Sequence, residues 1–141
     1  MAIQLPWIGY RDEMKYKRLA LQEAGFNIES TINMEFGLTL IQRQTYPVVI
    51  VQDWSPTGEL ELSAGIAYWN SPSADPTRLT YAFLKKVRSL SNYRLTPIVI
   101  PHFLDNEDAK RLQLDNSVEL IDLVHSESVT GCMVDAVRKH I

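Results

Sequence analysis

The sequence lacks the features that mark several large classes of protein. It contains a single cysteine, Cys132, so an intramolecular disulfide and a Cys-x-x-Cys metal or redox site are both excluded. No run approaches the roughly 20 apolar residues that a membrane-spanning helix needs. The first residues also lack the basic region and long apolar run of a secretion signal. We therefore expect a cytoplasmic protein that has no membrane partner.

Positive charge is scarce as well. The 141 residues include 14 lysines and arginines against 17 aspartates and glutamates, which gives a formal net charge of −3. Proteins that bind nucleic acid usually present a dominant basic surface, so we expect no nucleic-acid partner. P-loop, nucleophile-elbow and Ser-His-Asp spacings are all missing from the sequence. We therefore expect a protein that is not an enzyme.

The composition that is present is typical of a globular domain. Hydrophobic residues make up 45% of the sequence and charged residues 22%. A length of 141 residues fits one domain, and no repeat, low-complexity segment or linker divides it. We expect a single domain over residues 1–141, large enough to form a core without disulfide or metal staples.

Short apolar runs alternate with amphipathic stretches along the chain, which predicts a parallel sheet covered by helices. The predicted strands are Ala2–Ile8, Phe26–Thr31, Val48–Val51, Pro97–Ile100 and Val118–Val124. The predicted helices lie between Asp12 and Gly25, over Met34–Ile41, from Pro76 to Leu90, over Asp105–Leu114 and from Val129 to Lys139. Five such units with right-handed crossovers favour an α/β fold, a doubly wound parallel sheet in the strand order 2-1-3-4-5.

Two segments depart from this regular pattern. Pro6 lies inside the first predicted strand, where it cannot donate to a central ladder, so we expect that strand to be short or bulged. The connection over residues 55–76 is enlarged, and apolar and polar residues alternate in it as in an extended strand. We interpret it as a hairpin or arm packed over the end of the sheet. The alternative is an arm that adds a strand to a partner or to a second copy.

Ligands of doubly wound sheets bind beyond the carboxyl ends of the strands. In this chain, those ends are followed by the loops Gly9–Glu13, Asp53–Ser55, His102–Asp105 and His125–Glu127. The candidate site residues therefore come from these four loops.

Three segments carry a resemblance to a known family. They are Leu21-x-x-x-Gly25-Phe26-x-Ile28, Pro47 through Asp53 followed by Trp54, and Phe83–Arg88 followed by Pro97-Ile98-Val99-Ile100. Together they resemble the receiver domains of two-component response regulators over most of the chain outside about 55–76. The resemblance implies a flavodoxin-like fold and a role in signal transduction or phosphorelay. It also places Asp53 in the position of the phosphoaccepting aspartate.

The resemblance further implies how such a protein would act. Its partners would be other signalling proteins, and we expect no output domain after the last helix. In the family, copies pair through the face built from the fourth helix, fifth strand and fifth helix. A homodimer would accordingly use Asp108–Arg111 and Val129–His140.

Most of the family's phosphorylation chemistry is replaced here. Phosphoryl transfer in the family needs magnesium held by the aspartate and an acidic pair, a hydroxyl after the fourth strand and a lysine after the fifth. By alignment to the resemblance, these positions hold Ile8-Gly9, His102 and His125. Asp53 alone predicts at most a weak magnesium site, so we expect no cofactor and impaired or absent phosphorylation. A functional phosphoaccepting receiver at Asp53 is the alternative.

Three further residues are candidates by position. Asp12 and Glu13 follow the place of the acidic pair by a few residues. They fit the first turn of a helix, where carboxylates complement the helix dipole, and a remodelled loop would let them reach back to the site. Trp54 follows Asp53 directly and is a candidate binding residue, although Trp7, Trp54 and Trp69 also fit core or rim packing.

Other chemistries compete for the same end of the sheet. Asp53, His102 and His125 together would suit zinc, iron or nickel. A protonated histidine could instead replace the lysine as a countercharge, and the plainest interpretation makes both histidines exposed loop residues. A flavin-binding protein would need a Gly-, Ser- or Thr-rich loop after the first strand, which Pro6–Arg11 does not provide. A small metal- or flavin-binding flavodoxin-like protein stays a further alternative.

Overall fold

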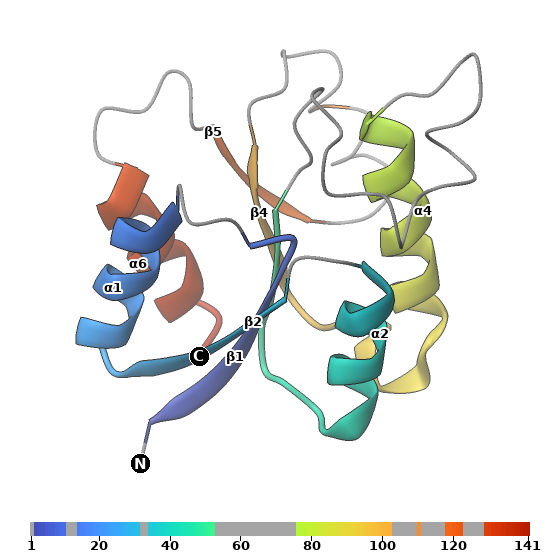
Figure 1. Ribbon diagram of the computed structural model, residues 1–141, viewed down its shortest axis with the longest axis horizontal. Coiled ribbons are helices and arrows are strands. Elements are labelled where there is room, and N and C mark those ends of the chain that lie inside the picture. Colours follow the sequence, from blue (N-terminus) through green and yellow to red (C-terminus); the bar gives the residue numbers. More distant parts are fainter. Residues whose placement is uncertain are drawn as a thin grey trace.

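The computed structural model describes residues 2–10, 14–31, 34–52, 76–102, 110, 118–122 and 129–141. These residues form a five-stranded parallel sheet in the order β2-β1-β3-β4-β5, with helices on both faces (Figure 1). The strands are β1 (Ile3–Ile8), β2 (Phe26–Thr31), β3 (Val49–Val51), β4 (Ile98–His102) and β5 (Glu119–Asp122). The helices are α1 (Lys15–Glu23), α2 (Met34–Arg43), α4 (Pro76–Ser89), α6 (Val129–Arg138) and the short 3₁₀ helix η2 (Ser91–Tyr93). The predicted fold class and strand order are confirmed.

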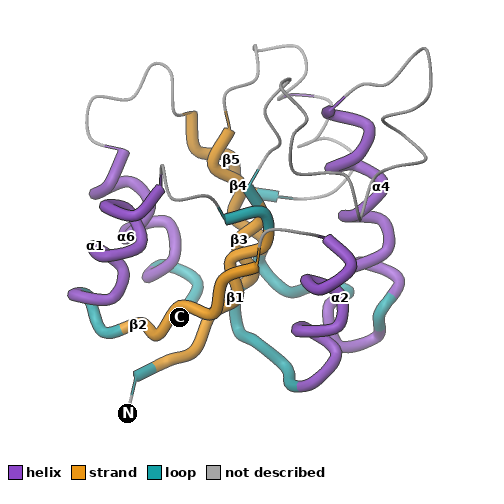
Figure 2. Tube along the Cα trace, viewed as in Figure 1, coloured by secondary structure: helices purple, strands orange, loops and turns teal. Residues whose placement is uncertain are grey.

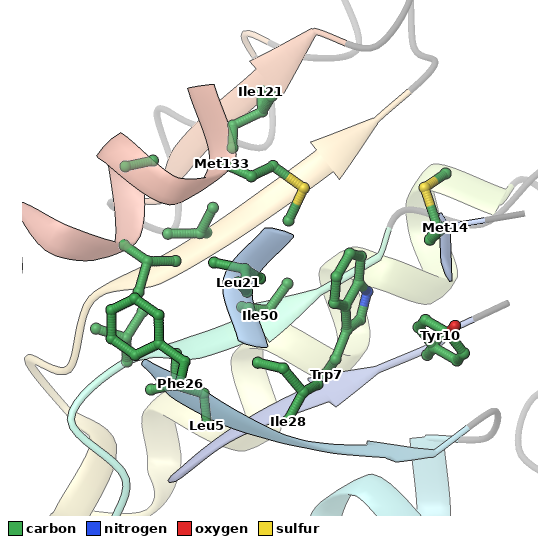
Figure 3. Close-up of a cluster of buried hydrophobic side chains, with 14 residues drawn as sticks. Leu5, Trp7, Tyr10, Met14, Leu21, Phe26, Ile28, Ile50, Ile121 and Met133 are labelled. Atoms are coloured by element: carbon green, nitrogen blue, oxygen red, sulfur yellow. The ribbon is translucent and has the colours of Figure 1, made fainter. Parts of the chain in front are cut away.

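The sheet separates two hydrophobic cores, because successive side chains of a strand point to opposite faces. Helices α1 and α6 cover one face, and α2 and α4 cover the other (Figure 2). Figure 3 shows the first core gathered between the sheet and helices α1 and α6. Its fully buried members are Leu5, Trp7, Leu21, Val48, Ile50, Val99, Met133 and Val137. The fully buried members of the second core are Ile8, Ile41, Val49, Val51, Leu84, Val87 and Ile100.

Two glycines set the local geometry of the first half of the chain. Gly25 has a φ of 101° just after α1, a left-handed conformation that costs glycine little and that turns the chain into β2. Its predicted role as a helix stop is confirmed. Gly37 is buried in α2, where an added Cβ would lie 2.6 Å from Cγ2 of Ile8. Helix α2 therefore approaches β1 as closely as it does because residue 37 has no side chain.

Strand β1 continues through Pro6, so the expected shortening or bulge is not present. All six residues of β1 pair with β2. The carbonyl of Ile8 accepts a hydrogen bond from the Gln52 N–H, 2.8 Å away, so Ile8 and, by alternation, Pro6 face β3. The β1–β3 register comprises only Trp7↔Ile50 and Ile8↔Val51. Pro6 therefore has no N–H on the side that faces β3. Strands β1 and β3 are not yet paired at this position, so no ladder hydrogen bond is lost there.

Several predicted segments fall outside the described residues. These are the connection 55–76 except Pro76, the helix Asp105–Leu114 except Lys110, and the last two residues of the strand Val118–Val124. The 3₁₀ helix η2 was not predicted. In the described part of the chain, no helix is both long and apolar enough to cross a membrane.

Candidate functional site

Strands β1, β3 and β4 end close together, and Gln52 joins them. Its backbone N–H donates to the carbonyl of Ile8 at 2.8 Å, and its side-chain Nε2 donates to the carbonyl of Pro101 at 3.1 Å. Gln52 is buried, with 3% of its surface exposed. It is also the residue directly before Asp53. The start of the β3 loop is therefore fixed to both neighbouring strands.

The hydrogen bond from Gln52 to Pro101 satisfies a carbonyl that lies beyond the last described pair of β3 and β4. The last described pair between β3 and β4 is Ile50↔Val99. Beyond it, Pro101 has a carbonyl but no N–H to offer. A buried carbonyl without a donor would cost on the order of 1–3 kcal/mol. The Gln52 carboxamide supplies this donor from a side chain and keeps the two strand ends together.

The end of β1 carries no acidic side chain. Ile8 is fully buried in the core under α2. Gly9 follows with a φ of 82°, a conformation that most side chains disfavour. The N–H groups of Gly9 and Tyr10 both donate to the carbonyl of Thr31, at 2.8 and 3.0 Å. The chain thus turns toward β2 as it leaves the strand.

His102 is the last residue of β4 and is opposite Asp122 of β5 in the register. Only 4% of its surface is exposed. The interpretation of His102 as an exposed loop residue is therefore wrong. Its pairing with Asp122 of β5 keeps this strand-end residue inside the protein.

Trp7 packs beside this region and has a structural role. It is fully buried, and its ring meets the ring of Tyr10 edge to face, with centroids 5.5 Å apart. The guanidinium of Arg18 lies 5.2 Å from the centroid of the Tyr10 ring. The predicted packing role of Trp7 is confirmed (Figure 3).

Comparisons with known proteins agree with this architecture. No family model and no curated protein match the sequence. Among solved structures, chemotaxis response regulator CheY4 of Vibrio cholerae is 15% identical, with both chains covered completely and a TM-score of 0.68. A putative response regulator from Chloroflexus aurantiacus is 16% identical, with 99% and 98% of the two chains covered and a TM-score of 0.70. An orphan response regulator of H. pylori is 11% identical, with 98% and 95% covered and a TM-score of 0.65.

The chain has the receiver-domain fold. At these identities the likeness concerns the fold, and the chemistry of the site has to be judged from the residues themselves. Strand β1 ends at Ile8 and is followed by Gly9. That these two residues replace the family's acidic pair, as the resemblance implies, stays a prediction. Strand β4 ends in His102, and its correspondence to the family's hydroxyl position likewise stays a prediction.

Most other candidate residues lie outside the described part of the receiver fold. These are Asp12, Glu13, Asp53, Trp54 and His125. Their convergence with His102 stays a prediction. Among the described residues, no group of three or more His, Cys, Asp or Glu side chains is placed to hold a metal ion.

Sequence reasoning missed Gln52 as a site residue. A signal was available, because Gln52 is the one polar residue between the apolar run Val48–Val51 and Asp53. A buried carboxamide at a strand end needs hydrogen-bond partners, and such groups seldom occur without a structural purpose. Its acceptor, Pro101, is 49 positions away in the sequence and could not be identified without the fold.

Proposed function

We propose that this protein is a receiver-like regulatory domain in signal transduction, which acts by contact with other signalling proteins and has no catalysis of its own. We further propose that magnesium-dependent phosphorylation of Asp53 is impaired or absent. The fold and its likeness to response regulators support the first part. The end of β1 supports the second, because neither the buried Ile8 nor Gly9 supplies a carboxylate.

The physical argument concerns charge at the reaction centre. Magnesium prefers octahedral oxygen ligation and is usually held through one or two carboxylates. Phosphoryl transfer depends almost wholly on positioning and on stabilising the developing negative charge. Asp53 without a neighbouring acidic pair leaves the metal with fewer protein ligands. His102, a buried imidazole in the place of a hydroxyl, changes the contact offered to a phosphoryl oxygen.

The test is direct phosphorylation of the purified protein. We expect no mass adduct after incubation with acetyl phosphate and millimolar magnesium, and no fluorescence change with beryllofluoride and magnesium. An Asp53→Asn variant is the control, because it distinguishes modification at Asp53 from modification elsewhere. A stoichiometric adduct that the Asp53→Asn substitution abolishes would overturn the proposed impairment and favour a functional phosphoacceptor.

The contact surface implied by the family resemblance includes α6, and this helix is fixed to the sheet at its carboxyl end. Glu119 of β5 pairs with Lys139 and accepts from Nε2 of His140 at 3.1 Å. Asp135, Arg138 and Lys139 are exposed on and just after the helix. The exposed charges of Asp135 and Arg138 can contact a protein partner, whereas Lys139 is paired with Glu119. Charge reversal at Asp135 and Arg138 together should weaken binding to a cognate signalling protein while leaving the fold intact.

A further inference from the structure

Strand β2 forms an open edge of the sheet. In the described part of the chain its strand neighbour is β1, on one side alone. Figure 1 shows β2 near the viewer, between α1 and α2, with neither helix crossing in front of it. The carbonyl of Thr31 accepts from Gly9 and Tyr10 and so faces β1. By alternation, the N–H and C=O groups of Ile28 and Ser30 face outward.

The β2 edge has few of the devices that proteins use to block edge-to-edge pairing, and its one charged side chain is Glu29. Such devices include proline, lysine, a bulge or a very short strand. Strand β2, with the sequence Phe-Asn-Ile-Glu-Ser-Thr, has six residues in continuous register, without proline or lysine. Strand β5, at the other edge, has four residues and two acidic side chains, Glu119 and Asp122. The β2 edge is therefore better suited than the β5 edge to pair with a strand of another chain.

A cavity of about 250 Å³ runs along this edge between β2 and α2. The strand contributes Glu29–Thr31 to its lining, and the helix contributes Phe36, Leu40 and Arg43. The side chain of Phe36 is 67% exposed, although phenylalanine is usually buried. The edge thus combines outward backbone groups with an apolar groove on the same side.

The charges of the groove indicate what would cover it. It carries one acid, Glu29, and one base, Arg43, so it has no net charge to attract a basic or an acidic peptide. Its electrostatic complement is a surface that also has one base and one acid. A second copy related by a two-fold axis supplies that complement, because an isologous interface pairs residue i with j and j with i.

We propose that β2 pairs antiparallel with β2 of a second copy, so that the two sheets become continuous and Arg43 of each copy faces Glu29 of the other. The two-fold axis passes at Ile28. A register centred on Glu29 would place two like charges directly opposite each other, which is destabilising. The axis at Ile28 instead sets Glu29 opposite the partner's Asn27 and Ser30 opposite the partner's Phe26. This surface is separate from the α6 face and does not depend on Asp53.

The first experiment measures the oligomeric state by sedimentation velocity over a wide range of protein concentration. We expect a concentration-dependent dimer for the wild type. The variants Arg43→Glu and Glu29→Lys, each alone, should weaken dimerisation by about tenfold or more, because each places like charges across the interface. Arg94→Glu is the matched control, since Arg94 is exposed and lies outside the groove. It should dimerise like the wild type.

The decisive measurement mixes the two variants. An equimolar mixture of Arg43→Glu and Glu29→Lys should form a heterodimer, because each copy then meets an opposite charge at both contacts. Thermal unfolding of each variant beforehand shows that it is folded. A wild type that stays monomeric, a dimer that both variants leave unchanged, or a mixture that stays monomeric would each overturn the proposal.

Amide hydrogen exchange tests the strand pairing itself. As the protein concentration rises, the amides of Ile28 and Ser30 should become at least about tenfold slower to exchange. The amide of Glu29 faces β1 and serves as the internal reference, since its protection should not change. Equal behaviour of all three amides would exclude pairing through the β2 edge, whatever the measured mass.

Discussion

The amino and carboxyl ends of the sheet are held in different ways. At the amino end, Tyr93 of η2 fastens the end of α2. Its hydroxyl lies 2.7 Å from the carbonyls of both Ile41 and Gln44, to which it can donate, and it accepts from the N–H of Tyr46 at 3.2 Å. Tyr93 is 1% exposed. A single side chain therefore satisfies backbone groups of the α2–β3 connection, which would otherwise be buried without partners.

Arg88 fastens the neighbouring connection at the same end. One guanidinium nitrogen donates to the carbonyl of Tyr93 at 2.8 Å and to that of Thr96 at 2.6 Å. Burial lowers the pKa of Arg88 from its usual value, since the charged form loses hydration. The Arg88 guanidinium thus binds two carbonyls of the chain between α4 and β4. These contacts hold the segment from which Tyr93 reaches α2.

Among the described residues of the carboxyl end, the Gln52 carboxamide has the comparable role. Gln52 ties β3 to β4 beside Asp53, while the end of β1 is fixed by backbone hydrogen bonds to β2. Within the described part of the chain, more long side chains bind distant backbone groups at the amino end than at the carboxyl end, where the candidate site lies. Residues at the site end can then change their chemistry without loss of the fold, as expected where function is carried by loops on a rigid scaffold.

Removing the Tyr93 hydroxyl should have the largest effect of the variants considered. Tyr93→Phe keeps the ring but leaves the Tyr46 N–H and a carbonyl of α2 without a partner. We expect the free energy of unfolding to fall by about 2–3 kcal/mol in urea denaturation. Tyr16→Phe, at a site 69% exposed, is the control and should change little. A loss as small as that of the control would show that the amino end is not held by this hydroxyl.

Alkaline pH should lower the free energy of unfolding, because it ionises Tyr46 at the same end of the sheet. Burial, then the charge of Glu29 and a hydrogen bond to it, raise the pKa of Tyr46 to about 12. The folded protein thus holds this proton more tightly than the unfolded chain, whose tyrosine titrates near 10. The contribution is complete below pH 10 and is lost as pH rises toward 12, by about 2–3 kcal/mol in total.

The measurement compares unfolding of the wild type with that of Tyr46→Phe between pH 9 and pH 11.5, a range chosen to span most of the window. Titrations that do not involve Tyr46 are common to both proteins and cancel in the difference. The charge of Tyr93, whose own pKa burial raises, contributes to the raised pKa of Tyr46 and is therefore part of the measured difference. The wild type should lose its advantage over Tyr46→Phe as pH rises. A difference that is independent of pH would contradict the assignment to Tyr46.

Removing the hydrogen bond of Gln52 at the carboxyl end should have the smallest effect on the free energy of unfolding. Gln52→Leu retains the volume of the side chain but removes the donor to Pro101. We expect a loss of about 1 kcal/mol in the free energy of unfolding, because one buried carbonyl loses its partner while apolar packing is kept. Gln42→Leu, at an exposed position of α2, is the control. An effect of Gln52→Leu larger than that of Tyr93→Phe would reverse the comparison between the two ends.

The sequence predicted the fold well because its signals are local. Buried parallel strands produce apolar runs such as Val48–Val51, and amphipathic helices produce apolar residues at helical spacing. Gly25 and its neighbours marked the turn from α1 to β2, and counting back from Gly25 located Ile8 and Gly9 at the end of β1. That the family's acidic pair is replaced at this end is implied by the resemblance and stays a prediction.

The site and its supports could be predicted only in part. Asp53 was located because it follows an apolar run, but Gln52 was overlooked and His102 was assigned to an exposed loop as one interpretation. The burial of His102 follows from pairing with β5, whose residues are 20 positions away in the register His102↔Asp122. Pro6 was expected to disturb β1, because the sequence does not show on which side of the strand the ladder begins.

Periodicity, turn residues and composition by themselves determined a doubly wound parallel sheet and the central strand that precedes Asp53 in the sequence. The tertiary structure alone decided which polar groups meet. Tyr93 binds the carbonyl of Ile41 across 52 positions, and Gln52 binds that of Pro101 across 49. The physical reason is that hydrophobic patterning repeats along a chain and can be seen locally. A hydrogen bond between distant residues depends on distance and direction in space, which exist only after the sheet has formed.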